Sequence, residues 1–155
     1  MLYDVGKIDA FYNGERGQMV AKLLREDLRN IWDPSKTASN LAVGFPFYFF
    51  TEGMICPVLM PVEIGGMAWA YEQEIYTAII DSKSWPLESD SIDCILISHA
   101  LEFIPDHHSF LMEAGRVLKS AGKLILMVPH RHGLWSRAET TPFGHGTPFS
   151  KGQIV

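Results

Sequence analysis

Two near-continuous aliphatic runs decide the fold: Ile92-Asp93-Cys94-Ile95-Leu96-Ile97 and Leu124-Ile125-Leu126-Met127-Val128. Runs of this kind are typical of strands that are buried on both faces of a parallel sheet. Between them, Asp106 can cap a helix whose apolar residues recur at helical spacing, with Lys119 in its last turn and Gly122 just beyond. The order strand, helix, strand predicts a right-handed parallel crossover.

Three shorter apolar runs lie upstream and bring the number of expected strands to five. The expected strands are Asn40–Gly44, Pro57–Pro61, Tyr76–Ile80, Asp93–Ser98 and Lys123–Val128. Apolar residues at three-to-four spacing predict an amphipathic helix from Phe11 to Trp32, which Pro34 brings to an end. These elements predict a single α/β domain over residues 1–155. We expect a three-layer, Rossmann-like, doubly wound sheet, mostly parallel, with helices on both faces.

The composition is that of a globular protein and limits its partners. Hydrophobic residues make up 47% of the chain and charged residues 20%, which excludes disorder of the whole chain. The net charge of -5 argues against nucleic acid, whose phosphates require clustered Lys and Arg. Cys56 and Cys94 form no C-x-x-C pair, which suits a reducing compartment, and we expect a cytoplasmic protein. No secretory signal is predicted, because the N-terminus has no apolar region after a basic start. No membrane span is predicted, because no apolar run reaches about 18 residues.

The stretch from Trp85 to Pro129 resembles the second half of a class I S-adenosylmethionine-dependent methyltransferase domain, of the branch often called methyltransferase type 11. Members of that branch show L-P-F/L, then S-F/V-D, then a strand ending near H-x-L-E/H, then R-V-L-x-P-G-G. The corresponding stretches here are Trp85-Pro86-Leu87, Ser91-Ile92-Asp93, His99-Ala100-Leu101-Glu102 and Arg116-Val117-Leu118-Lys119-Ser120-Ala121-Gly122, with Ser-Ala replacing Pro-Gly.

The resemblance implies S-adenosylmethionine as cofactor, bound above the first, second and fourth strands. Gly44 would lie under the methionine moiety, Met60 beside the ribose, and Ser84 and Trp85 at the adenine. Residues 99–101 would form the floor of the site. The full set of implied cofactor-binding residues is Ala42, Gly44, Phe45, Met60, Ser84, Trp85, His99, Ala100 and Leu101.

Two departures from the family pattern concern the methionine and ribose ends of the site. Only Gly44 matches the glycine-rich turn, and Phe45-Pro46-Phe47 adds bulk and removes a donor. We expect the aromatic run that begins at Phe45 to pack mainly in the core. Met60 stands where most class I enzymes place an acidic residue for the ribose hydroxyls, and Glu63 can substitute only if its loop folds back.

Two further departures concern the adenine end and the length. Lys83-Ser84 replaces the usual Asp-Ala, and Asp81 either takes over the role of that carboxylate or is a turn residue. The two strands that usually form an antiparallel hairpin beside the fifth strand are not expected within 155 residues. The edge at Lys123–Val128 would then be open, so we expect a truncated gene product or pairing with a second copy.

The resemblance predicts methyl transfer to a small-molecule or protein acceptor, and the alternative is a non-catalytic or vestigial domain that acts as a binding module. Glu102 could act as a base or simply orient its loop, so no catalytic residue is assigned. Trp85 could equally stack on the adenine or pack in the core. The six histidines are scattered without carboxylate or Cys partners at ligand spacing, so no metal site is expected.

Overall fold

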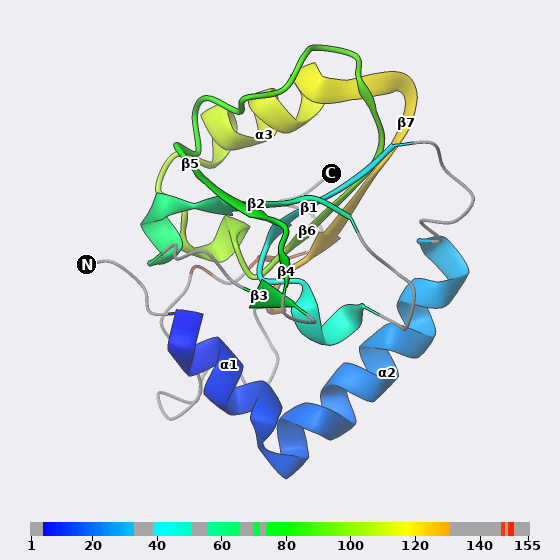
Figure 1. Cartoon of the computed structure of the whole chain (residues 1–155), viewed down its shortest axis with the longest axis vertical. Helices are drawn as coiled ribbons and strands as arrows, with labels where there is room; N and C mark the ends of the chain where they lie inside the picture. Colours follow the sequence, from blue (N-terminus) through cyan, green and yellow to red (C-terminus); the bar gives the residue numbers. More distant parts are fainter. Residues whose placement is uncertain are drawn as a thin grey trace.

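A five-stranded parallel sheet forms the centre of the computed structural model, which describes residues 5–32, 39–50, 56–65, 70–71, 74–130, 147, 149 and 150 (Figure 1). Its strands are β1 (Asn40–Gly44), β2 (Val58–Pro61), β5 (Thr77–Ile80), β6 (Ile92–Ser98) and β7 (Leu118–Met127). Their order across the sheet is β5-β2-β1-β6-β7, and every pair of neighbours is parallel. The predicted doubly wound α/β fold is confirmed.

The strand order reverses in the middle of the sheet. β1 pairs with β2 on one side and with β6 on the other, so the chain must cross over β2 and β1 between β5 and β6. In open α/β sheets, ligands bind outside the carboxyl ends of the strands at such a reversal point. The carboxyl ends of β1 and β6 are therefore where a site is expected.

Two helices cover one face of the sheet, where the sequence predicted one. The helix expected from Phe11 to Trp32 is instead α1 (Val5–Asn13) and α2 (Glu15–Ile31), which meet at a sharp corner at Gly14 (Figure 1). A side chain at Gly17 would place its Cβ 2.0 Å from the backbone oxygen of Phe11. The prediction of a continuous helix was wrong because this close backbone approach gives no signal in the hydrophobic spacing.

The opposite face is covered by α3 (His107–Val117), which is capped as predicted by Asp106. The Asp106 side chain accepts a hydrogen bond of 3.0 Å from the Ser109 backbone N–H. Placing Lys119 in the last helical turn was wrong, since the helix stops at Val117 and β7 begins at once. Lys119 instead extends across to β6, where its Nζ lies 2.9 Å from Asp93 Oδ1.

Short elements connect the strands. Three 3₁₀ turns follow β1, β2 and β6 respectively: η2 (Phe47–Phe49), η3 (Val62–Ile64) and η4 (Leu101–Phe103). A two-stranded antiparallel ladder, β3 (Ala70–Tyr71) with β4 (Glu74–Ile75), precedes β5 and was not predicted. Among the described residues, β7 is the last strand at its side of the sheet. In the same part of the chain, no helix is long and apolar enough to cross a membrane.

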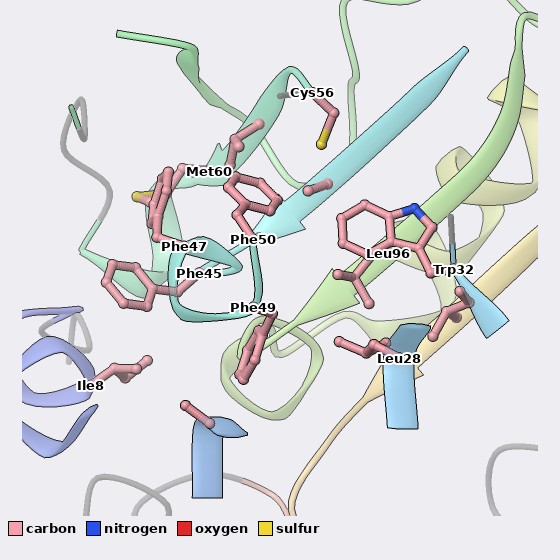
Figure 2. Close-up of a cluster of buried hydrophobic side chains, with 14 of the residues drawn as sticks. Ile8, Leu28, Trp32, Phe45, Phe47, Phe49, Phe50, Cys56, Met60 and Leu96 are labelled. Atoms are coloured by element: carbon pink, nitrogen blue, oxygen red, sulfur yellow. The ribbon is translucent and has the colours of Figure 1, made fainter. Parts of the chain in front are cut away.

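Alternate residues of each strand enter two different cores. Ala42, Met60 and Leu96 join the cluster beneath α1 and α2, which also contains the aromatic residues of η2 (Figure 2). Val43 and Ile97 point to the other face, against α3. The period of two along a strand explains this division, because successive side chains leave a sheet on opposite faces. The predicted core packing of the aromatic run from Phe45 is confirmed.

The α3 side of the core provides a first test. Phe110 is completely buried, and its ring lies 5.4 Å from that of Trp85. We expect Phe110→Ala to lower the free energy of unfolding by about 3–5 kcal/mol, the usual cost of emptying a buried aromatic site. Urea denaturation measures this value. Met112→Ala on the same helix, where Met112 is 61% exposed, should stay within about 0.5 kcal/mol of the wild type. Equal losses for the two variants would contradict the described packing.

Candidate functional site

The turn after β1 lies directly against the end of β6. Gly44 has a φ of 94°, and a Cβ there would lie 2.1 Å from the backbone oxygen of Ser98 and 2.9 Å from the Cβ of Ala100. The Phe45 N–H donates to that same Ser98 oxygen at 2.8 Å, and Ser98 Oγ donates to the Phe45 oxygen at 2.9 Å. The glycine is therefore required by the protein's own backbone at the reversal point of the sheet.

Three of the residues predicted at the cofactor have side chains that belong to the core. Ala42, Phe45 and Met60 have no exposed surface, and all three lie in the cluster beneath α1 and α2. The Phe45 ring packs edge-on against that of Phe47, with 5.2 Å between ring centroids. Their side chains are therefore closed to a ligand, and only their backbone atoms are left for contact with one.

A carboxylate does reach the carboxyl end of β2. Glu63 lies in η3, directly after the strand, and its Oε1 accepts a hydrogen bond from Ser82 Oγ in the loop after β5. The second oxygen, Oε2, is buried and has no hydrogen-bond partner within the described residues. A buried oxygen without a donor is costly, so such an atom points to a water or to a ligand donor.

The loop after β5 holds the two residues predicted at the adenine. Asp81 is a turn residue, because its Oδ1 accepts from the Lys83 N–H at 2.8 Å and its backbone oxygen from the Ser84 N–H at 3.1 Å. Ser84 is exposed. Trp85 is only 3% exposed, and its Nε1 donates to the Ser82 oxygen at 3.2 Å. Of the two interpretations of Trp85, the indole takes the core position.

Arg116 holds this loop in place, a role that the sequence did not reveal. Its guanidinium donates to the backbone oxygens of Trp85 at 3.0 Å and Leu87 at 2.9 Å. It also pairs with Glu113 at 2.7 Å, and Glu113 accepts the Trp85 N–H at 2.7 Å. The hydrogen bond from Arg116 lowers the pKa of Glu113, so this pair stays charged at neutral pH. The arginine of the R-V-L motif thus anchors the loop between β5 and β6.

His99 follows β6 in a left-handed backbone conformation, with a φ of 49°, which costs a non-glycine residue about 1–2 kcal/mol. The residue is 4% exposed. Its Nε2 lies 2.8 Å from Tyr12 Oη, and its Nδ1 lies 3.4 Å from Glu102 Oε1. The position after β6 agrees with the prediction, but the imidazole is buried against α1. Its neighbours Ala100 and Leu101 are also buried.

Tyr12, Ser82 and Ser98 are polar residues of this region that sequence reasoning missed. Tyr12 is 1% exposed and lies on the same buried face of α1 as Val5 and Ile8. A single phenol on an otherwise apolar helix face was the available signal. The two serines gave none, because their partners come from distant segments.

The chain resembles known methyltransferases both in sequence and in fold. A family model described as "Methyltransferase domain" matches residues 68–126. The match confirms the predicted resemblance over the segment from β3 to β7.

A crystal structure of a SAM-dependent methyltransferase, possible histamine N-methyltransferase, from Thermotoga maritima superposes with a TM-score of 0.70 at 21% identity. The alignment covers 97% of this chain and 76% of that one. The two proteins share a fold. No curated protein sequence matches the chain.

The turn after β1 provides a second test. We expect Gly44→Ala to lower the free energy of unfolding by about 2–4 kcal/mol, because a Cβ would overlap the Ser98 oxygen and the φ of 94° is strained for alanine. Gly115→Ala is the matched control. It lies in α3 with no atom within 4 Å of a new Cβ, and should stabilise the protein by about 0.5–1 kcal/mol. Chemical denaturation measures both values, and a neutral Gly44→Ala would refute the close approach.

Proposed function

We propose that this protein transfers a methyl group from S-adenosylmethionine to an acceptor, at the carboxyl ends of β1, β2 and β6. The methyltransferase match over residues 68–126 and the shared fold support a reaction of this kind. The observation that carries the proposal for this chain is the Glu63 carboxylate, whose Oε2 is buried at the end of β2 without a partner among the described residues. An acceptor oxygen at this place suits a ribose hydroxyl.

The described residues fit the cofactor unevenly along its length. Glu63 would accept the ribose hydroxyls in place of the acidic residue that Met60 replaces. Ser84, which is exposed, and the backbone beside Trp85 would lie at the adenine. The backbone of residues 42–45 and 99–101 would line the methionine end. When bound, the cofactor supplies an already activated methyl group, so the protein has mainly to hold and align it.

The acceptor is proposed to be a small molecule or a protein, and the compartment the cytoplasm. The net charge of -5 does not favour nucleic acid. The structural relative from Thermotoga maritima is titled a possible histamine N-methyltransferase, which makes small amines a reasonable first set of acceptors to assay. Pairing of two copies through the edge of β7 is a further part of the proposal, because no other strand of the described residues lies beyond β7. A single bridge between His130 and Phe149 lies just past the end of that strand.

One observation favours the second candidate function, a binding module without catalysis. The turn after β1 donates its Phe45 N–H to the protein's own Ser98 oxygen, so this donor is not open to a methionine carboxylate. A vestigial site would have closed in this way. Isothermal titration with S-adenosylmethionine and with S-adenosylhomocysteine decides between the two. Saturable binding of both supports the enzyme, and no binding by folded, monodisperse protein supports the module.

Glu63 provides the third test. We expect Glu63→Gln to weaken S-adenosylhomocysteine binding by about 10- to 100-fold, the range for losing a hydrogen bond to a charged group. Glu88→Gln makes the same chemical change at an exposed position on the loop before β6 and should leave binding unchanged. Titration calorimetry measures both dissociation constants. Equal affinities for Glu63→Gln and the wild type would remove Glu63 from the cofactor site.

A further inference from the structure

Tyr12, His99 and Glu102 form a buried chain of polar groups that joins α1 to the loop after β6. They are 1%, 4% and 2% exposed respectively, although the three side chains carry five polar atoms between them. Tyr12 Oη lies 2.8 Å from His99 Nε2, and His99 Nδ1 lies 3.4 Å from Glu102 Oε1. The imidazole is thus held on both sides by groups 87 and three residues away in sequence.

The hydrogen atoms between Tyr12, His99 and Glu102 can be assigned from the chemistry of these three side chains. Burial, together with the nearby Glu102 carboxylate, raises the pKa of Tyr12 well above its usual value, so the phenol keeps its proton. A protonated phenol beside a neutral imidazole donates to the bare nitrogen. The arrangement that satisfies both neighbours has Tyr12 donating to Nε2 and the ring's own hydrogen on Nδ1, because a carboxylate oxygen can only accept. From Nδ1 it faces the Glu102 carboxylate.

The Tyr12–His99–Glu102 side chains also lie at a strained piece of backbone. His99 has a φ of 49°, and the next residue, Ala100, faces the Gly44 turn across the reversal point. A left-handed conformation in a non-glycine residue persists only where the surroundings enforce it. The imidazole is packed between rings of α1 and η2, with its centroid 5.5 Å from that of Tyr12 and 5.9 Å from that of Phe49.

We propose that Tyr12 is a positioning residue, whose phenol holds His99 in the Nδ1–H tautomer and thereby fixes the loop after β6 for cofactor binding. The 2.8 Å contact on Nε2 is shorter than the 3.4 Å contact on Nδ1, so we take Tyr12 as the stronger of the two groups that favour this tautomer. The assignment of the tautomer rests on this geometry and on the protonated phenol, and it does not depend on the proposed function. The effect on cofactor binding rests on the proposed function.

Tyr48 offers a matched control on the neighbouring ring. It stacks on Tyr12 with 5.0 Å between ring centroids, and its hydroxyl donates to Asp9 Oδ1 at 2.5 Å. Tyr48→Phe therefore removes a hydroxyl that ties α1 to η2, while the Tyr12 hydroxyl stays on His99. Loss of α1 anchoring in general would affect both variants, whereas a role specific to His99 affects only Tyr12→Phe.

The test is ¹⁵N NMR of the histidine side chains at about pH 8.5, where an ordinary imidazole is neutral. His99→Gln assigns the His99 signals. We expect the Nδ1–H tautomer in the wild type, in Tyr48→Phe and in Glu102→Gln, and a gain of the Nε2–H tautomer in Tyr12→Phe. An Nε2–H ring in the wild type would overturn the proposal. So would an unchanged ring in Tyr12→Phe, since Glu102 would then set the tautomer.

Titration calorimetry with S-adenosylhomocysteine tests the second half of the proposal. Tyr12→Phe should weaken binding about tenfold, as expected for the loss of one organising hydrogen bond, and Tyr48→Phe less than twofold. Equal weakening in both variants would reduce Tyr12 to general anchoring of α1. If the wild type binds no S-adenosylhomocysteine, the proposed function and this effect on binding both fail, and the NMR result still decides the role of Tyr12 at His99.

Discussion

The contact between the Gly44 turn and the Ser98 backbone oxygen sets how closely β1 and β6 approach at their carboxyl ends. A methyl group at Gly44 would meet that oxygen at 2.1 Å, and the Phe45 N–H uses the same oxygen as its acceptor. Two strands far apart in sequence are thereby locked at the point where the strand order reverses. The positions of His99 and Ala100 follow from this lock, because both come directly after Ser98.

Polar contacts fix the helical layer on the α1 side, although the layer is held mainly by apolar packing. Tyr12 reaches His99, Tyr48 reaches Asp9, and Arg25 donates to the Tyr48 backbone oxygen at 2.9 Å. Apolar surface alone is non-directional and leaves a helix free to slide. Buried hydrogen bonds add direction, since each has a partner at only one place. Helix α1 is therefore aligned with the edge of the sheet that carries the candidate site.

Two carboxylates at this edge share an unusual feature. Glu63 after β2 and Glu102 after β6 each have one oxygen that is buried and without a hydrogen-bond partner among the described residues. Carboxylates at the same sheet edge add negative potential in a chain whose net charge is already -5. Such an edge suits a ligand that brings hydroxyl donors and a positive charge. A sulfonium cofactor has both, which is in keeping with the proposed function.

The sequence alone determined the parallel α/β architecture and the approximate positions of the five strands of its main sheet. Near-continuous aliphatic runs such as Ile92–Ser98 are typical of strands buried on both faces, and motif residues near Trp85 and Arg116 indicated the resemblance that the family model matches over residues 68–126. Tertiary structure decided the other features: the corner between α1 and α2, the start of β7 at Leu118 and the Tyr12–His99 contact. Each depends on contacts between segments that are distant in the chain or on backbone approaches around glycine. Hydrophobic spacing reports which side of an element is buried, and it carries no information about what lies against that side.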